Sequence, residues 1–126
     1  MFEKLKDLLK NSYAKYSNYR VSAIIVTKDG KEFNGVNIEN ASYGATICAE
    51  RSAISNAISN GYKDFKELYV MVDSNIIAPP CFICRQVISE LCDKDMDIIC
   101  MNNVGEQKRY KVSELCVYPF SEDNLR

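Results

Sequence analysis

The alternation of short β-branched runs with segments of helical periodicity is the strongest constraint on the fold of this chain. Apolar runs typical of buried strands occupy residues 20–27, 67–73 and 96–101. The segments at 48–60 and 81–91 carry apolar residues at helical spacing; Gly61 ends the first, and two prolines precede the second. Strands that alternate with helices favour a sheet covered by helices, with its later strands partly parallel. The pattern therefore predicts the α/β class.

The remaining segments complete a predicted order α-β-β-α-β-α-β-β. Apolar side chains at helical spacing predict a helix over the first dozen residues: Phe2, Leu5, Leu8 and Leu9. The turn sequence KDGK at 28–31 and the alternating residues 32–39 predict a β-hairpin with the run 20–27. A short strand near 108–112 and a polar tail follow. With 126 residues and no repeats or linker, the chain is expected to form one domain, residues 1–126.

Charge and hydropathy limit the partners that this chain is expected to have. Its net charge is −1, whereas sequence-independent nucleic-acid binding normally needs a basic surplus, so we expect a small-molecule substrate and no nucleic acid. No apolar run approaches the roughly 20 residues that span a bilayer, which predicts no membrane partner. The N-terminus resembles an amphipathic helix and not a secretory signal, so the expected location is the cytoplasm.

The chain contains no histidine and six cysteines, at positions 48, 81, 84, 92, 100 and 116. Without histidine, catalytic pairs of the Ser-His and Cys-His types and histidine-based metal sites are excluded. In a reducing compartment, free thiols or metal ligands are favoured over disulfides. Any transition metal must therefore be held by thiolates or carboxylates.

Two segments concentrate the residues with chemical potential: TICAER at 46–51 and PPCFICRQ at 79–86. The C-x-x-C pair of Cys81 and Cys84 is ambiguous alone, since it suits half of a structural zinc site or a redox dithiol. Cys48 has local support as a third thiolate, and three protein ligands with one open position are typical of catalytic zinc. Zinc lowers the pKa of bound water from about 16 toward 7. Glu50 is the candidate group to move protons beside that water.

Three thiolates leave a zinc site net negative, and two features are expected to offset that charge. Both cysteine segments lie at predicted helix N-termini, whose positive ends favour anions. Arg51 and Arg85 lie beside the ligands and are candidates to donate hydrogen bonds to sulfur. Gln86 is a candidate to bond a ligand loop, with an ordinary helix position as the alternative. Cys92, Cys100 and Cys116 lie in apolar stretches and are expected to fill the core.

Taken together, these motifs resemble those of the small homotetrameric zinc-dependent cytidine deaminases. The matching stretches are YSNYRV at 16–21, NIENASYG at 37–44, CAER at 48–51, PCFICRQV at 80–87 and PFSED at 119–123. The resemblance covers nearly the whole chain. It implies a three-layer α/β/α fold with a mixed five-stranded sheet, one Zn²⁺ per subunit, and hydrolysis of cytidine to uridine and ammonia in pyrimidine salvage. Deoxycytidine is expected to react likewise.

The resemblance also implies a role for individual residues. Cys48, Cys81 and Cys84 would bind zinc, and Glu50 would carry protons from water to N3 of cytosine and to the departing amine. The implied substrate contacts are Asn37 and Glu39 to the ribose 3′-hydroxyl, Ala49 N–H to the 2-carbonyl, the Pro79 carbonyl to the amino group, and Tyr19 beside the nucleoside. Ala41, Tyr43 and Phe120 would reach a neighbouring subunit's site. Independently of the resemblance, Asn37 and Glu39 lie at alternate positions of a predicted strand, so they face the same side and suit a sugar hydroxyl.

Three positions depart from the family's usual residues: Phe82 and Ser22 replace glycine, and Tyr19 replaces phenylalanine. A side chain at position 82 is expected to narrow the pocket or strain the turn, and the Tyr19 hydroxyl to add a hydrogen bond. The sequence also suits four alternative functions. They are a deaminase of another aminopyrimidine nucleoside such as a nucleoside antibiotic, a polynucleotide deaminase, a non-catalytic zinc-binding module with a fourth protein ligand, and a thiol redox protein.

Overall fold

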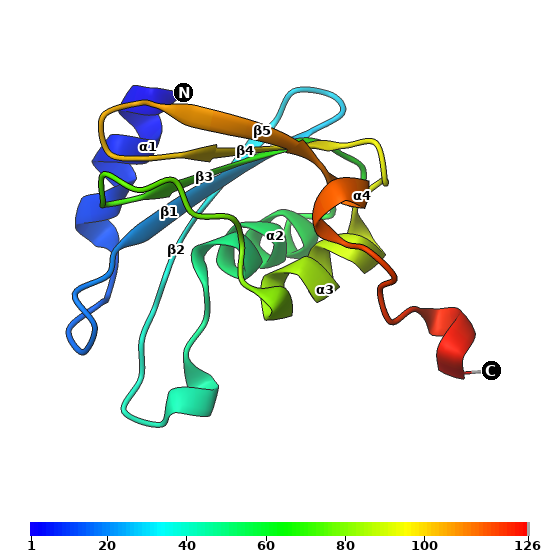
Figure 1. Ribbon diagram of the computed structural model, residues 1–126, viewed down its shortest axis with the longest axis horizontal. Coiled ribbons are helices and arrows are strands. Elements are labelled where there is room, and N and C mark those ends of the chain that lie inside the picture. Colours follow the sequence, from blue (N-terminus) through cyan, green and yellow to red (C-terminus); the bar gives the residue numbers. More distant parts are fainter. Residues whose placement is uncertain (126) are drawn as a thin grey trace.

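A five-stranded mixed sheet forms the centre of the computed structural model, which describes residues 1–125 (Figure 1). The strands are β1 (Val21–Thr27), β2 (Glu32–Val36), β3 (Phe65–Val72), β4 (Asp97–Met101) and β5 (Gln107–Lys111). Their order is β2-β1-β3-β4-β5. The pair β3 and β4 is parallel and the other pairs are antiparallel, so the predicted mixed sheet with partly parallel later strands is confirmed.

Alternate side chains of the central strands serve two separate apolar layers, as the two-residue period of a strand requires. In β1, Ala23 and Ile25 face one layer, and Ile24 and Val26 face the other. Helices α2 (Ala49–Ser59) and α3 (Phe82–Leu91) cover the first face, while α1 (Phe2–Leu8) covers the second (Figure 1). The predicted α/β/α layering is therefore confirmed.

Helix α2 packs unusually close to the edge strand β2. Its sheet-facing residues are small, with Ala49, Ala53 and Ala57 fully buried. Opposite them lies Gly35, where an added Cβ would come within 2.3 Å of the Ala53 nitrogen. Any other residue at position 35 would therefore push α2 away from the sheet. This contact sets the position of the first turn of α2, which carries Cys48 and Glu50.

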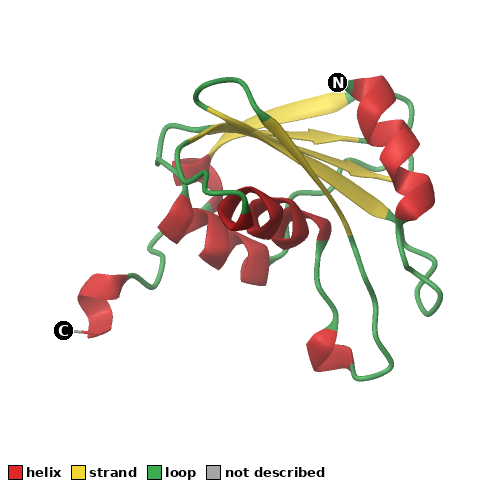
Figure 2. Cartoon of the chain, turned by 180° about the vertical axis from the view of Figure 1, so that it is seen from behind, coloured by secondary structure: helices red, strands yellow, loops and turns green. Residues whose placement is uncertain are grey.

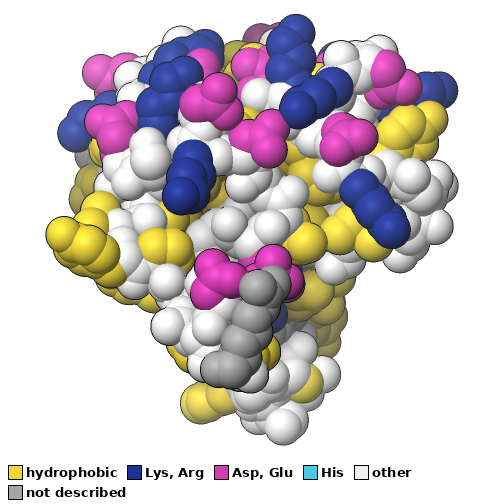
Figure 3. All heavy atoms as spheres, turned by 90° about the vertical axis from the view of Figure 1, so that its right-hand side faces the viewer, with side chains coloured by type: hydrophobic (Ala, Val, Ile, Leu, Met, Phe, Trp, Pro, Cys, Tyr) yellow, Lys and Arg dark blue, Asp and Glu magenta, His cyan; other side chains and the backbone are white. Residues whose placement is uncertain are grey.

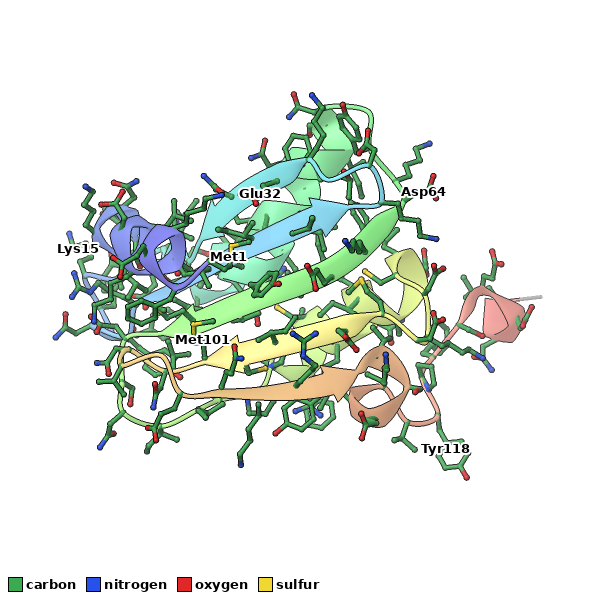
Figure 4. The ribbon with its side chains drawn as sticks, turned by 90° about the horizontal axis from the view of Figure 1, so that it is seen from above. Met1, Lys15, Glu32, Asp64, Met101 and Tyr118 are labelled. Atoms are coloured by element: carbon green, nitrogen blue, oxygen red, sulfur yellow. The ribbon has the colours of Figure 1, made fainter. Side chains whose placement is uncertain are left out.

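Helix α1 lies across one end of the opposite face, as the view from above shows (Figure 4). Leu5 is fully buried there against Ile24, Met71 and Ile99. Ser22, also fully buried, donates its hydroxyl to the Leu5 carbonyl at 2.8 Å. The serine that replaces the family's glycine thus joins α1 to the sheet, on the face away from α2 and α3.

Several element boundaries differ from the prediction. The N-terminal helix changes to a 3-10 helix, η1, at Leu9–Asn11 and ends at Ser12. Strand β2 ends at Val36 and not at residue 39, because the ladder that it forms with β1 does not continue past Val36. Ile38 forms isolated bridges to Tyr13 and Ile47 instead. These bridges draw the segment 12–19 and the entry to α2 toward one another, beside the end of the sheet.

The C-terminal part of the chain extends away from the sheet (Figures 1 and 2). A short helix, α4 (Val112–Leu115), follows β5, and a 3-10 helix, η3 (Glu122–Leu125), forms the projecting tail. A further 3-10 helix, η2 (Tyr43–Ala45), lies in the long connection from β2 to α2. Within residues 1–125, none of the helices has the length and apolar character needed to cross a membrane.

Candidate active site

Cys48, Cys81 and Cys84 meet where α2 and α3 begin. Cys48 is the N-cap residue of α2 and Cys81 that of α3, and neither forms a side-chain capping bond. Cys84 lies in the first turn of α3 and is fully buried. Both N-cap residues have extended backbone, so their sulfurs are free to face a shared point next to two positive helix ends. The predicted cysteine cluster is thus brought together by two helix starts that are 33 residues apart.

The spacing of the three sulfurs suits a tetrahedral metal ion. The Cys48 and Cys81 Sγ atoms are 3.7 Å apart, and all three sulfurs lie within 4.8 Å of one another. A Zn–S distance of about 2.3 Å in a tetrahedral site implies sulfurs roughly 3.8 Å apart. Among the described residues this is the one group of three or more cysteine, aspartate and glutamate side chains placed to hold a metal. Because the group ends at three ligands, one tetrahedral position is left for solvent or substrate.

Hydrogen bonds favour the thiolate form of Cys48. The neighbouring Cys84 thiol, followed by Arg51 and Cys81, lowers the pKa of Cys48 to about 5. The Arg51 guanidinium donates from Nη2 to the Cys48 sulfur at 3.7 Å and to the Thr46 carbonyl at 3.4 Å. Arg51 therefore lies where the prediction places it, beside a ligand sulfur, and its positive charge offsets part of the charge of the cluster.

Glu50 is the buried carboxyl group of this site, with 5% of its surface exposed. Burial raises the pKa of Glu50 to about 7, and the negative charge of Cys48 adds to the effect. A carboxyl group with a pKa near 7 can both accept and release a proton at neutral pH. The backbone of the first turn of α2 carries Cys48 and Glu50 to the same cavity, although residues two apart on a regular helix face different sides.

A cavity of about 280 Å³ opens beside the cysteines, at the end of the sheet between β1, β3 and the start of α2. Most of the predicted substrate-contacting residues line it: Tyr19, Asn37, Glu39, Ala49 and Pro79, together with Cys48, Glu50 and Cys81. Apolar walls come from Val21, Val70 and Val72. The cavity lining thus contains two polar groups: Asn37 and Glu39 from the segment after β2, and Glu50 with the cysteines from the helix starts.

Two serines that the sequence interpretation did not assign hold the polar residues in place. The Ser12 hydroxyl bonds to the Asn37 side-chain carbonyl, and the Ser17 hydroxyl bonds to Glu39 Oε2. The Asn37 amide also donates to the Tyr19 carbonyl at 2.7 Å, and its oxygen accepts from Val21 N at 2.9 Å. The stretch YSNYRV contains Ser17 and matches the family's pattern, which was the available signal for that residue.

Comparisons with known proteins agree on one family. Residues 1–100 match the family model described as the cytidine and deoxycytidylate deaminase zinc-binding region. A cytidine deaminase from Halalkalibacterium halodurans is 40% identical over 92% of this chain and 88% of its own length. This chain belongs to the cytidine deaminase family. The crystal structure of cytidine deaminase from Burkholderia pseudomallei has a TM-score of 0.89 and 37% identity, covering 94% of this chain and 95% of that one. A blasticidin-S deaminase from Bacillus cereus is 35% identical over 79% of this chain and 75% of its own length.

Phe82, the main departure from the pattern of the cytidine deaminase family, lies outside the cavity. Its ring is exposed and stacks under Arg85, whose guanidinium carbon lies 4.4 Å from the ring centroid. Residue 82 begins α3 and does not have a positive φ, so glycine is not required there. The expected narrowing of the pocket or straining of the turn is thus not observed, because the side chain points along the outside of α3.

Arg85 and Gln86 support the cysteine segment differently from the prediction. The Arg85 guanidinium donates to backbone carbonyls and not to a ligand sulfur: Nε donates to Pro80 at 2.8 Å and Nη1 to Leu115 at 3.3 Å. Gln86 donates to the Phe120 carbonyl at 2.8 Å. Both residues therefore connect α3 to its surroundings: Arg85 fixes the peptide before Cys81, and Gln86 holds the C-terminal tail.

Three residues that the resemblance assigns to a neighbouring subunit's site lie away from the cavity of this chain. Tyr43 is 81% exposed in the connection between β2 and α2, and Ala41 lies nearby on the same exposed segment. Phe120 lies on the tail and is also exposed. Their positions leave them available for contacts with other molecules.

Proposed function

We propose that this protein is a zinc-dependent cytidine deaminase, which hydrolyses cytidine and deoxycytidine to uridine and deoxyuridine with release of ammonia. The observation that carries the proposal is the meeting of three cysteine sulfurs and a buried carboxyl group beside a cavity of about 280 Å³. Cys48, Cys81 and Cys84 would hold the ion. Zinc in such a site supplies a water molecule whose pKa is lowered to near 7.

Glu50 would serve as the proton carrier of the reaction. It would accept a proton at the start of the reaction, deliver one to N3 of the pyrimidine, and then protonate the departing amino group at C4. Its pKa of about 7 without bound metal, which burial produces, suits a group that must be both acid and base. The low exposure of Glu50 also keeps bulk water from competing for these protons.

Backbone groups at the metal end would orient the base. The Ala49 N–H is the first of α2, so it has no acceptor within the helix and can donate to the pyrimidine 2-carbonyl. The Pro79 carbonyl, on the cavity wall, would accept from the amino group. Tyr19 would flank the nucleoside; burial and the nearby Glu50 raise the pKa of its hydroxyl, which therefore remains able to donate.

Asn37 and Glu39 would read a sugar hydroxyl with the bonds that the fold leaves unused. One Asn37 N–H is bonded to the Tyr19 carbonyl, which leaves the second N–H free to donate. Glu39 accepts from Tyr16 N, Ser17 N and the Ser17 hydroxyl, which leaves about one of its four lone-pair positions. One free donor beside one free acceptor suits a hydroxyl group, which both accepts and donates.

We further propose a homotetramer with shared active sites, working in the cytoplasm without nucleic-acid or membrane partners. Large apolar side chains are exposed around the start of α3 and the tail: Phe82, Ile83, Val117, Tyr118 and Phe120. Tyr118 points away from the body of the molecule (Figure 4). On the side that carries the tail, basic and acidic side chains are interleaved (Figure 3), which does not suit a polyanion. All six cysteines are free thiols, as a reducing compartment favours. Native mass spectrometry should therefore show an assembly with the mass of four chains.

A second candidate is a deaminase of a nucleoside antibiotic, which the similarity to the Bacillus cereus blasticidin-S deaminase favours. The free donor and acceptor at Asn37 and Glu39 favour an ordinary ribose instead. A non-catalytic zinc module would need a fourth protein ligand, and among residues 1–125 the cluster holds three.

The test combines a metal count with a substrate panel. We expect purified protein to contain one zinc per chain and to convert cytidine and deoxycytidine, followed by the ultraviolet change between cytidine and uridine. Blasticidin S and single-stranded DNA serve as the competing substrates. Dialysis against a chelator should remove activity, and added zinc should restore it. Preferred turnover of blasticidin S would select the second candidate, and a zinc-loaded protein inactive on every substrate would contradict both.

A further inference from the structure

Among the contacts that join the turn at residues 16–19 to the segment after β2, one comes from an exposed side chain, that of Ser17. The Ser17 hydroxyl donates to Glu39 Oε2, and the Ser17 backbone N–H donates to Glu39 Oε1 at 3.0 Å. The same hydroxyl oxygen accepts from the Tyr19 N–H at 3.0 Å. A single side chain therefore contacts a polar wall of the cavity, Glu39, and fixes the backbone of another wall, Tyr19.

The two Glu39 oxygens are held unequally. Oε1 accepts two backbone N–H bonds, from Tyr16 and Ser17, both at 3.0 Å. Oε2 accepts the Ser17 hydroxyl, the one bond recorded for it among the described residues. The carboxylate is rigid and planar, so the two N–H bonds on Oε1 already restrain rotation about the last side-chain bond, which is otherwise soft. The Ser17 hydroxyl occupies one lone pair of Oε2 and so determines which lone pair of that oxygen stays available. These bonds also lower the pKa of Glu39, chiefly through the Ser17 hydroxyl, so the group remains ionised and acts only as an acceptor.

The backbone around Ser17 is shaped for this contact. Asn18 has a φ of 57°, a left-handed conformation that asparagine tolerates better than most residues. Its N–H closes the turn on the Ala14 carbonyl at 2.8 Å. The left-handed residue lies between Ser17, which bonds to Glu39, and Tyr19, which lines the cavity. Ser17 itself is exposed and packs against no apolar core, so its hydroxyl can be removed without leaving a hole.

We propose that Ser17 is a positioning residue that orients the Glu39 carboxylate for the sugar hydroxyl of the substrate. The inference rests on the proposed function, since it names the residue that prepares the sugar end of the same site. Asn37 depends less on its own serine: without Ser12, its amide keeps the bonds to the Tyr19 carbonyl and the Val21 N–H. Without the Ser17 hydroxyl, Glu39 keeps the two N–H bonds on Oε1, but Oε2 has no other hydrogen bond among the described residues. Ser17 is therefore the side chain that acts directly on this oxygen.

The experiment pairs a protein change with a substrate change in the zinc-loaded enzyme. Ser17→Ala and Ser17→Thr are compared with the wild type on cytidine and on 3′-deoxycytidine, which lacks the hydroxyl assigned to Glu39. We expect Ser17→Ala to lower kcat/KM for cytidine about tenfold, mainly through a higher KM, because a hydrogen bond to a charged group is lost. For 3′-deoxycytidine we expect a change of less than about twofold. Ser17→Thr should keep most of the wild-type value, since it retains the hydroxyl.

The control variant is Ser55→Ala, which removes an exposed hydroxyl from α2 outside the cavity. It should leave both substrates unchanged, and circular dichroism should show the same thermal midpoint for all variants within about 2 °C. An equal loss on both substrates, or no loss on cytidine, would overturn the role of Ser17 while leaving cytidine deamination intact. A wild-type enzyme that does not convert cytidine would instead contradict the proposed function as well, so the two failures are distinguishable.

Discussion

The two faces of the sheet are built from the same strands but carry different side chains. The face under α1 is closed by aliphatic residues and methionine, with Leu5, Ile24, Met71 and Ile99 fully buried. The layer under α2 and α3 also contains thiols and a carboxyl group: Cys84 and Cys100 are fully buried there, and Glu50 nearly so. Alternation along each strand therefore separates a layer that serves stability from a layer that also serves chemistry.

This contrast shows how the active face, which α2 and α3 cover, accommodates its polar groups. Small residues, Ala49, Ala53 and Gly35, let α2 approach the sheet closely enough to fix the first turn that carries Cys48 and Glu50. The α1 face needs no such close approach, because a short amphipathic helix only covers it. A change on the α1 face should thus alter stability first, and a change at the start of α2 should alter activity first.

The largest expected effect is on the active face. Replacing the buried carboxyl group with an amide in Glu50→Gln should lower kcat for cytidine by roughly 10²–10⁴-fold, because the proposed proton carrier is lost. Zinc content and thermal midpoint should stay near those of the wild type, since glutamine fills nearly the same volume. Steady-state kinetics and a metal count measure both. The exposed Glu90→Gln on α3 is the matched control, and near-normal turnover by Glu50→Gln would remove Glu50 from the mechanism.

The opposite face should respond in the reverse way. Leu5→Ala leaves a cavity between α1 and the sheet and should lower the free energy of unfolding by about 2–5 kcal/mol. Denaturant titration gives this value, and kcat measured where the variant is fully folded should match the wild type. Lys10→Ala, which breaks an exposed ion pair with Asp7, should cost less than about 1 kcal/mol. A large fall in kcat for folded Leu5→Ala would show that the two faces are coupled.

Local patterns predicted most of the fold. Strands β1, β3 and β4 and helices α2 and α3 were predicted within about two residues, because β-branched runs, helical spacing, Gly61 and Pro80 act locally. The early end of β2 was missed because tertiary bridges of Ile38 to Tyr13 and Ile47 override the local alternation. The three-layer arrangement came from family resemblance and is confirmed by the structural comparison.

The sequence predicted the main residues of the candidate site but not the side chains that hold them in place. Residue types and their spacing identified Cys48, Cys81, Cys84 and Glu50 as candidates, because few combinations of residues suit a metal site and a proton carrier without histidine. The bond from Ser17 to Glu39 joins residues 22 positions apart, and the direction of the Phe82 ring depends on Arg85. A sequence pattern carries no information about either side-chain direction, so only coordinates place these groups.

The last prediction compares adjacent residues of β4 on the two faces, Cys100 and Ile99. Burial, with a smaller contribution from Glu50, raises the pKa of Cys100 from 9.0 to about 12. The folded state therefore keeps the thiol protonated where the unfolded state ionises. This contribution to stability is complete below pH 9 and is lost as the pH rises from about 9 to 12.

Cys100→Ala should consequently lose stability less steeply over that pH range than the wild type, as measured by urea unfolding at several pH values. Ile99→Val removes no titratable group, so its cost of about 0.5–1.5 kcal/mol should be the same at every pH. If the free energy of unfolding of Cys100→Ala and of the wild type fell in parallel with pH, the buried thiol would not contribute to the pH dependence of stability. The chemical difference between the two faces would then be confined to the residues around the cysteine cluster.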